Sequence, residues 1–135
     1  MKANWKALAG LSVALALGAT SPAWGAGETI KVGVLAEMSG TFASFGQQIT
    51  NGARAYMKAH GDTVAGHKVE LIVRDTTGPA PDVTKRLAQE LIVQDNVDFL
   101  AGFGLTPNAM AVAPIITEAK KPTICLLYTS PSPRD

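Results

Sequence analysis

Few residues of this 135-residue chain have the type and spacing that catalysis requires. The two histidines, His60 and His67, end a helical pattern and follow a turn glycine, and neither has an acidic partner nearby in the sequence. We interpret both as solvated surface residues and not as general bases. Asp75 comes at the end of an apolar run. A carboxylate there commonly caps a turn or a helix, and a functional role stays open.

The glycine-rich and nucleophile motifs of the common α/β enzymes do not occur in the sequence. The loop Ala36 to Thr41 has one glycine where a dinucleotide site would have G-x-G-x-x-G. Gly102-Phe103-Gly104 follows a later apolar run, but Pro107 stands at the place of a third glycine. There is no phosphate loop, no G-x-S-x-G elbow and no metal-ligand spacing of His, Cys, Asp and Glu. The sequence therefore predicts a protein that is not an enzyme and that has no cofactor and no metal.

Two side chains beside predicted strand ends remain as candidates for binding. Thr106-Pro107 begins a helical segment, because proline is tolerated in the first turn. The Thr106 hydroxyl can cap that helix, which is worth about 1 kcal/mol, and the same helix start favours a bound carboxylate. Phe45 lies in a Gly/Ser-bearing loop before another helix, which it can staple by packing. From the residues alone, capping and packing are favoured, and ligand contact stays open.

The elements that position these residues alternate between strands and helices. Apolar runs rich in β-branched residues predict buried strands, and apolar residues spaced by three and four predict amphipathic helices. The predicted strands cover residues 30–36, 69–75, 97–102 and 122–124; the predicted helices cover 46–60 and 82–92, and a third starts at Thr106. The order βαβαβαβ predicts an α/β fold with a parallel sheet and helices on both faces. Ligands of such sheets bind at the loops after the strands, here Glu37 to Phe45, Thr76 to Pro81 and Phe103 to Pro107.

Residues 1–25 have the pattern of a secretory signal peptide. Lys2 and Lys6 precede an apolar run from Ala7 to Ala19, which is too short to span a bilayer comfortably. Small residues predict cleavage between Gly25 and Ala26, and no lipobox-like cysteine follows the run. The alternative, an uncleaved anchor, would need roughly 18 apolar residues. In a bacterial host the protein is therefore expected in the periplasm.

The last eleven residues, CLLYTSPSPRD at 125–135, do not continue the pattern before them. Pro131 and Pro133 stand where a buried strand should run on. The segment can be back-translated into a string that resembles the transposase adaptor used in preparing sequencing libraries. We expect a non-native, adaptor-derived tail on a truncated gene product; a natural disordered Pro/Ser tail is the alternative. The codons of the gene decide between the two.

Charge and cysteine content exclude further classes. The chain has 12 basic and 11 acidic residues, a formal net charge of +1, and no basic run of the kind that follows phosphates. Nucleic acid is therefore not an expected partner. The single cysteine, Cys125, lies outside the predicted domain, so no disulfide is expected within it.

Residues 28–124 resemble the start of a periplasmic binding protein. The most specific parts are the MSG-x-x-A-x-[FY]-G pattern in MSGTFASFG and the G-F-G-x-T-x-x-x-x-x-x-A-P pattern in GFGLTPNAMAVAP. The chain is similar to the leucine/isoleucine/valine-type substrate-binding proteins of ABC importers. The resemblance implies that residues 26–124 are part of the first of two α/β lobes joined by a hinge. It also implies a ligand in the cleft between the lobes and a membrane permease that recognises the closed form.

The resemblance further implies which residues contact the ligand, an amino acid or a small organic acid. Phe45 takes the place of an aromatic residue that packs on the ligand, and Thr106 that of a hydroxyl residue that binds its carboxylate. Backbone groups at Gly104 and Leu105 would complete the wall. Branched-chain amino acid binders have tyrosine where this chain has Phe45, so aromatic acids stay open as ligands.

Two other classes of function share the predicted fold. A ligand-sensing receptor domain would contain the same lobe, and adjacent permease and ATPase genes would favour transport over sensing. An exported α/β enzyme would turn over its bound ligand.

Overall fold

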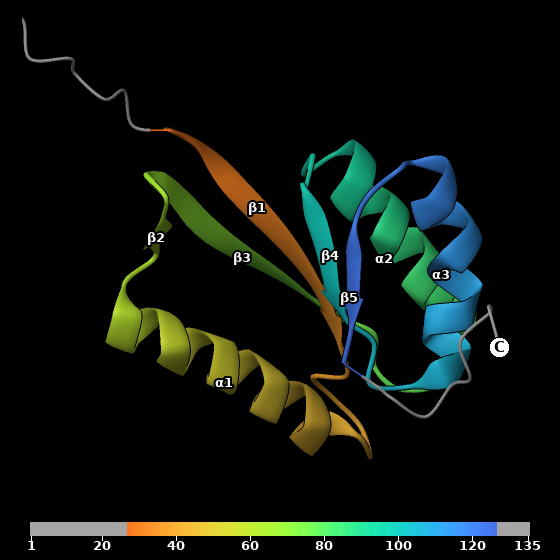
Figure 1. Cartoon of the computed structure of the whole chain (residues 1–135). Coiled ribbons are helices and arrows are strands. Elements are labelled where there is room, and N and C mark those ends of the chain that lie inside the picture. The colour runs from red at the N-terminus through yellow and green to blue at the C-terminus, as the bar shows by residue number, and fades with distance from the viewer. Residues whose placement is uncertain (1–26, 127–135) are drawn as a thin grey trace, which may run out of the picture.

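The computed structural model describes residues 27–126, so the predicted signal peptide and all but the first two residues of the predicted tail lie outside it. Strands and helices alternate along most of the described chain (Figure 1). No helix within this range is long and apolar enough to cross a membrane. In chain order the elements are β1 Gly27–Ala36, α1 Ala43–His60, β2 Thr63–Val64, β3 His67–Asp75, α2 Pro81–Val93, β4 Phe99–Gly102, α3 Thr106–Glu118 and β5 Thr123–Cys125.

The five strands form one sheet in the order β2-β3-β1-β4-β5. Strands β3, β1, β4 and β5 are parallel, as predicted, but β2 pairs antiparallel with β3. The predicted parallel sheet is therefore confirmed, and β2 adds one short antiparallel strand at its edge that the sequence did not predict. The extra strand arises at Ala65-Gly66, where two successive residues with positive φ, 50° and 85°, form a tight hairpin turn.

Helices cover both faces of the sheet, as predicted: α2 and α3 lie on one face and α1 on the other (Figure 1). The core lies on the α2–α3 face, where Leu35 of β1 and Leu100 of β4 are fully buried. Gly33 leaves room there, because a β-carbon at this position would lie 3.0 Å from Leu91 and 3.1 Å from Leu100. The whole cluster consists of Leu35, Leu87, Ala88, Leu91, Val97, Leu100, Phe103 and Val112.

On the other face, α1 packs less closely against the sheet. A cavity of about 420 Å³ lies between them, lined almost wholly by apolar side chains such as Val32, Val34, Ile49 and Leu71. The helix also begins three residues earlier than predicted, at Ala43 instead of Gly46. The first turn of α1 consequently includes residues that the sequence placed in a loop.

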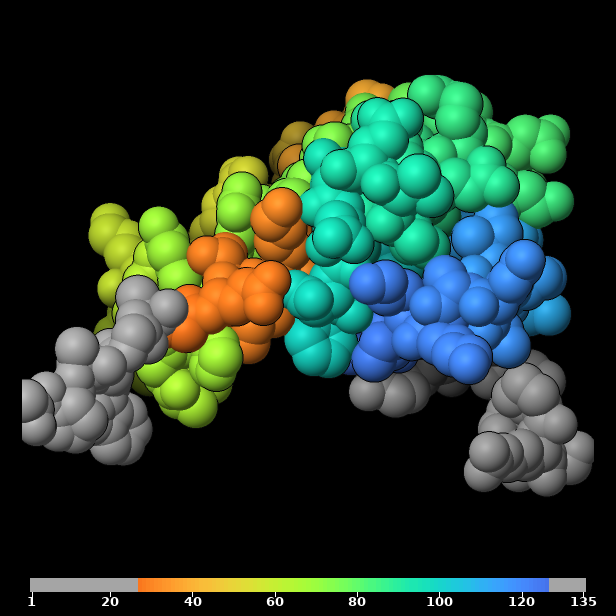
Figure 2. All heavy atoms as spheres, turned by 90° about the horizontal axis from the view of Figure 1, so that it is seen from above, coloured from red at the N-terminus to blue at the C-terminus, as the bar shows by residue number. Residues whose placement is uncertain are grey.

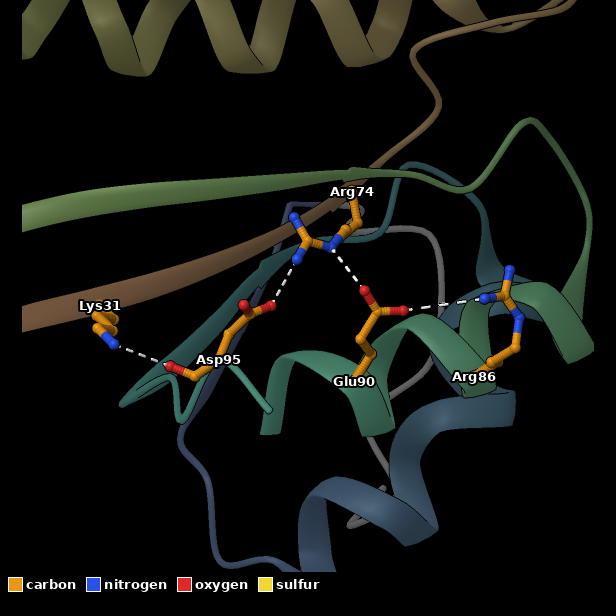
Figure 3. A network of polar contacts seen from close by, with 5 residues as sticks. All are labelled: Lys31, Arg74, Arg86, Glu90 and Asp95. Atoms are coloured by element: carbon orange, nitrogen blue, oxygen red, sulfur yellow. Dashed lines mark hydrogen bonds and ion pairs between the residues drawn. The ribbon is translucent and has the colours of Figure 1, made fainter. Parts of the chain in front are cut away.

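A chain of ion pairs joins the end of β3 to α2 and to the turn after it (Figure 3). Nη2 of Arg74 donates to Oδ2 of Asp95 at 2.7 Å, and its Nε lies 3.5 Å from Oε1 of Glu90. Oε2 of Glu90 is 3.9 Å from Nη1 of Arg86, and Lys31 Nζ donates to the backbone carbonyl of Asp95 at 3.1 Å. The side chain of Arg74 is 29% exposed, so water only partly screens the ion pair between Arg74 and Asp95.

Replacing Arg74 by lysine should lower the free energy of unfolding of the complete protein by about 1 kcal/mol. Lysine keeps the charge but cannot bind two carboxylates with one planar group. The matched control is Arg86→Lys, because the Arg86 side chain is 68% exposed and its change should stay within about 0.5 kcal/mol. Chemical denaturation measures both, and equal effects would show that the planar group of Arg74 contributes nothing special.

Candidate functional site

Three loops leave the carboxyl ends of neighbouring parallel strands and meet at one edge of the sheet (Figure 1). They span residues 37–42 after β1, 76–80 after β3 and 103–105 after β4. Figure 2 looks onto the opposite end of the molecule, where the orange start of β1 lies beside the teal segment that leads into β4. Because β3, β1 and β4 are neighbouring parallel strands, the three loops predicted to bind a ligand lie together at the other end.

Asp75 joins the first two loops. Its Oδ1 accepts hydrogen bonds from the backbone N–H groups of Met38 and Thr77, both at 2.8 Å. Burial alone would raise the pKa of Asp75, but hydrogen bonds from the Ser39 hydroxyl and from the backbone of Thr77, Met38 and Ser39 lower this pKa below its ordinary value of 3.8. Asp75 thus has the capping role that its position predicted, and it holds a second loop as well.

The lowered pKa of Asp75 predicts a pH-dependent contribution to stability. A carboxylate whose pKa is lower in the folded state stabilises that state above its unfolded pKa, and the contribution is lost as the pH falls through the folded value. Asp75→Asn should therefore be less stable than the wild type at pH 7, and the difference should shrink below about pH 3.8. Thermal unfolding of both proteins across this range is the measurement. A difference that is the same at pH 3 and pH 7 would contradict it.

The first turn of α1 packs closely against the backbone at the end of β1. Gly46 is buried, and a β-carbon there would overlap the backbone of Glu37. This contact places Phe45 in the first turn of α1 and not in the loop before it, with 57% of its surface exposed. Phe42 is the N-cap residue of α1, so Phe45 does not occupy the staple position before the cap. The packing role favoured from the sequence is therefore wrong, and the ring is available on the surface.

The turn from β4 into α3 has an unusual backbone. Gly102 has a φ of 110° and Phe103 a φ of 62°, and Phe103 donates its N–H to the carbonyl of Leu35 at 2.8 Å. Gly104, Leu105 and Thr106 follow and are half-buried. Thr106 is the first helical residue, and Leu105 is the N-cap, so the capping role favoured for Thr106 is also wrong.

All three helices begin at this edge without a side-chain hydrogen bond at the N-cap, and only α2 has an acidic residue, Asp82, in its first turn. The amino end of a helix carries a partial positive charge, which an acidic residue or a bound anion stabilises. The amino ends of α1 and α3 therefore each favour an anionic group, although the buried carboxylate of Glu37 already lies against the turn that leads into α3.

Sequence reasoning missed a buried acidic residue at the same edge. Glu37 follows β1 and is fully buried, and its Oε1 accepts a hydrogen bond from Nδ2 of Asn108 on α3 at 3.3 Å. The two residues are far apart in the sequence, and the sequence pattern places Glu37 only in a loop. The sequence did contain a sign of this burial, because Glu37 is an acidic residue that directly follows the apolar run of β1.

Comparison with known proteins places the chain in a family. The profile of the periplasmic binding protein family matches residues 29–135. A Leu/Ile/Val-binding protein homolog of Brucella abortus is 42% identical over 99 residues, which are 73% of this chain and 25% of that protein.

Solved structures agree with this match. A solute-binding protein of an ABC transporter from Rhodopseudomonas palustris, in complex with 3,4-dihydroxybenzoic acid, has 56% identity and a TM-score of 0.70 over 72% of this chain and 26% of that one. A leucine-binding protein from Thermotoga maritima has 27% identity and a TM-score of 0.67 over 72% and 27%. The chain spans about a quarter of the length of these relatives. It belongs to the periplasmic binding protein family, among the members of Leu/Ile/Val-binding type.

Proposed function

We propose that the complete protein is the solute-binding component of an ABC importer and captures a small aromatic carboxylic acid. The observation that carries this proposal is the exposed ring of Phe45 at an edge where α1 and α3 begin without an acidic residue in the first turn. An aromatic ring on the surface offers a stacking partner, and the helix starts favour a carboxylate. The site would thus have one group for each end of a benzoate-like molecule.

The four predicted site residues have separate roles in this proposal. Phe45 packs on the ring of the ligand, and the Thr106 hydroxyl donates a hydrogen bond to its carboxylate. Backbone groups of Gly104 and Leu105 form the wall between them. The second lobe would supply the remaining contacts and close over the ligand by a hinge motion, and a membrane permease would then receive it.

Relatives support an aromatic acid over an amino acid. Two structures from Rhodopseudomonas palustris, at 56% and 52% identity, are complexes with 3,4-dihydroxybenzoic acid and 4-hydroxybenzoate. The leucine-binding protein from Thermotoga maritima is only 27% identical. The relatives named as Leu/Ile/Val-binding homologs, at 42% identity, make branched-chain amino acids the alternative ligands.

The same proposal assigns the rest of the chain. Residues 1–25 would direct export to the periplasm, with cleavage near Gly25 and Ala26, and residues 26–124 would form part of the first lobe. Residues 125–135 would be adaptor-derived. The described residues contain no group of three His, Cys, Asp or Glu side chains that could hold a metal ion. A binding role without catalysis fits the relatives, which are solute-binding proteins.

Calorimetry on the complete protein, expressed from the uninterrupted gene, tests the ligand class. We expect 4-hydroxybenzoate to bind and leucine to bind at least tenfold more weakly, a difference of about 1.4 kcal/mol. Tighter binding of leucine would favour the amino acid alternative. Binding of neither ligand, in a protein that unfolds cooperatively, would reject both assignments.

A further inference from the structure

Polar side chains are buried beneath the loops at the carboxyl ends of the parallel strands. The proposed ligand contacts do not use these side chains. Glu37, Thr76 and Asn108 are each at most 1% exposed. They come from the loop after β1, the loop after β3 and the first turn of α3. A polar group buried to this degree must be satisfied by hydrogen bonds, because its contacts with water are lost on folding.

Asn108 ties two of the loops to α3. Its Nδ2 donates to the carbonyl of Gly78 at 2.8 Å and to Oε1 of Glu37 at 3.3 Å. Its Oδ1 accepts from the N–H of Ala80 at 3.0 Å. Both ends of the amide are therefore engaged, and Asn108 has no donor left for the other oxygen of Glu37.

Two atoms of this group have no hydrogen-bond partner in the described part of the chain, Oε2 of Glu37 and Oγ1 of Thr76. Both are buried, and a carboxylate oxygen is among the most costly atoms to bury unpaired. In folded proteins such atoms are usually satisfied by an ordered internal water, which needs two to four polar partners. A carboxylate oxygen and a hydroxyl supply two partners of suitable kind.

The strand register places the two residues opposite each other just beyond the ends of β3 and β1, with Oε2 of Glu37 on the side of Gly104. Residues of β1 and β3 pair up to Ala36 and Asp75, and Thr76 donates its N–H to the carbonyl of Ala36 at 3.0 Å. Glu37 and Thr76 are the next residues on these strands, which run about 4.8 Å apart. Side chains alternate along a strand, so both point to the side of the sheet that Leu35 faces.

We propose that Glu37 and Thr76 bind one internal water molecule, which fixes the Glu37 carboxylate as a support for the Gly104–Thr106 wall of the ligand site. The support is direct, because a β-carbon on Gly104 would overlap Oε2 of Glu37. Oε2 of Glu37 thus fills the space beside Gly104, and a carboxylate that turned away would no longer pack against this residue. Glu37 is in this sense a positioning residue, and that part of the inference rests on the proposed function, whereas the water site does not.

The test uses the complete protein and three variants of matched chemistry. Thr76→Val removes the hydroxyl and keeps the shape, and Thr76→Ser keeps the hydroxyl. Thr84→Val is the control, because Thr84 is equally buried but its hydroxyl donates to the carbonyl of Ala80 within its own helix turn. Crystal structures of the wild type and of Thr76→Val locate ordered water, and calorimetry with 4-hydroxybenzoate gives the affinity of each protein.

We expect a water within hydrogen-bond distance of Glu37 Oε2 and Thr76 Oγ1 in the wild type and not in Thr76→Val. Affinity for 4-hydroxybenzoate should fall about tenfold in Thr76→Val and stay within about twofold in Thr76→Ser and Thr84→Val. A wild-type structure with no such water overturns the inference. Unchanged affinity in Thr76→Val overturns the positioning role. A wild type that shows the water but binds no aromatic acid supports the water site and rejects the proposed function instead.

Discussion

Replacing Gly46 by alanine should lower the free energy of unfolding of the complete protein by about 2–4 kcal/mol. The added β-carbon would overlap the backbone oxygen, carbon and nitrogen of Glu37, none of which can turn aside as a flexible side chain would. α1 must then move away from the end of β1. Alanine improves helix propensity by about 1 kcal/mol, which does not offset a displaced helix.

The same helix offers a matched control for this change. Gly52 has no atom within 4 Å of the place where its β-carbon would stand, among the residues that the structure describes. Gly52→Ala should therefore raise stability by about 0.5–1 kcal/mol, because alanine loses less conformational freedom in a helix than glycine. Urea denaturation of the two variants measures the contrast. If both substitutions stabilised the protein, the close contact between α1 and β1 would be wrong.

Replacing Phe45 by alanine should weaken binding of 4-hydroxybenzoate by about 1–3 kcal/mol, which is roughly 5- to 150-fold in the dissociation constant. The variant removes the ring on which the ligand is proposed to stack. Because Phe45 is 57% exposed, its loss leaves no sizeable hole in the core, and stability should change little. Thr106→Ala should weaken binding by a similar amount, because the ligand carboxylate loses a hydrogen bond inside a closed site.

Tyr56→Ala is the control for the aromatic change. Tyr56 is on the same helix, 64% exposed, and stacks on His60 near the opposite end of α1. Three helical turns separate it from Phe45, about 16 Å along the axis. Its loss should leave the affinity for 4-hydroxybenzoate unchanged. Wild-type affinity in both Phe45→Ala and Thr106→Ala would remove these two residues from the site.

The order of the main elements could be predicted because the strands and helices differ in hydrophobic period. The runs that became β1 and β4 are nearly continuous in apolar residues, as expected for strands covered on both faces. The two residues of β2 are too short a run to show any period, and their pairing depends on the turn at Ala65-Gly66. Gly66 marked a turn, but alanine seldom has a positive φ, so Ala65 gave no sign that the turn was a two-residue hairpin.

The candidate site could be predicted only in part, for a similar reason. The three loops follow from the strand order, since parallel strands put their carboxyl ends at one edge. The start of α1 at Ala43 depends on the contact of Gly46 with Glu37, and the burial of Glu37 depends on Asn108 of α3. These are contacts between distant segments, which local periodicity does not encode.

The place of β1 in the sheet has a consequence for how fast the protein folds. β1 comes first among the described strands, yet it lies between β3 and β4, which are made after it. Leu35 pairs with Arg74 on one side, and Val34 pairs with Ala101 on the other. Pairings between such distant residues close large loops and make folding slow. For a protein exported as proposed above, this arrangement gains time for crossing the membrane before folding, because the central strand has no partners until β3 and β4 have been made.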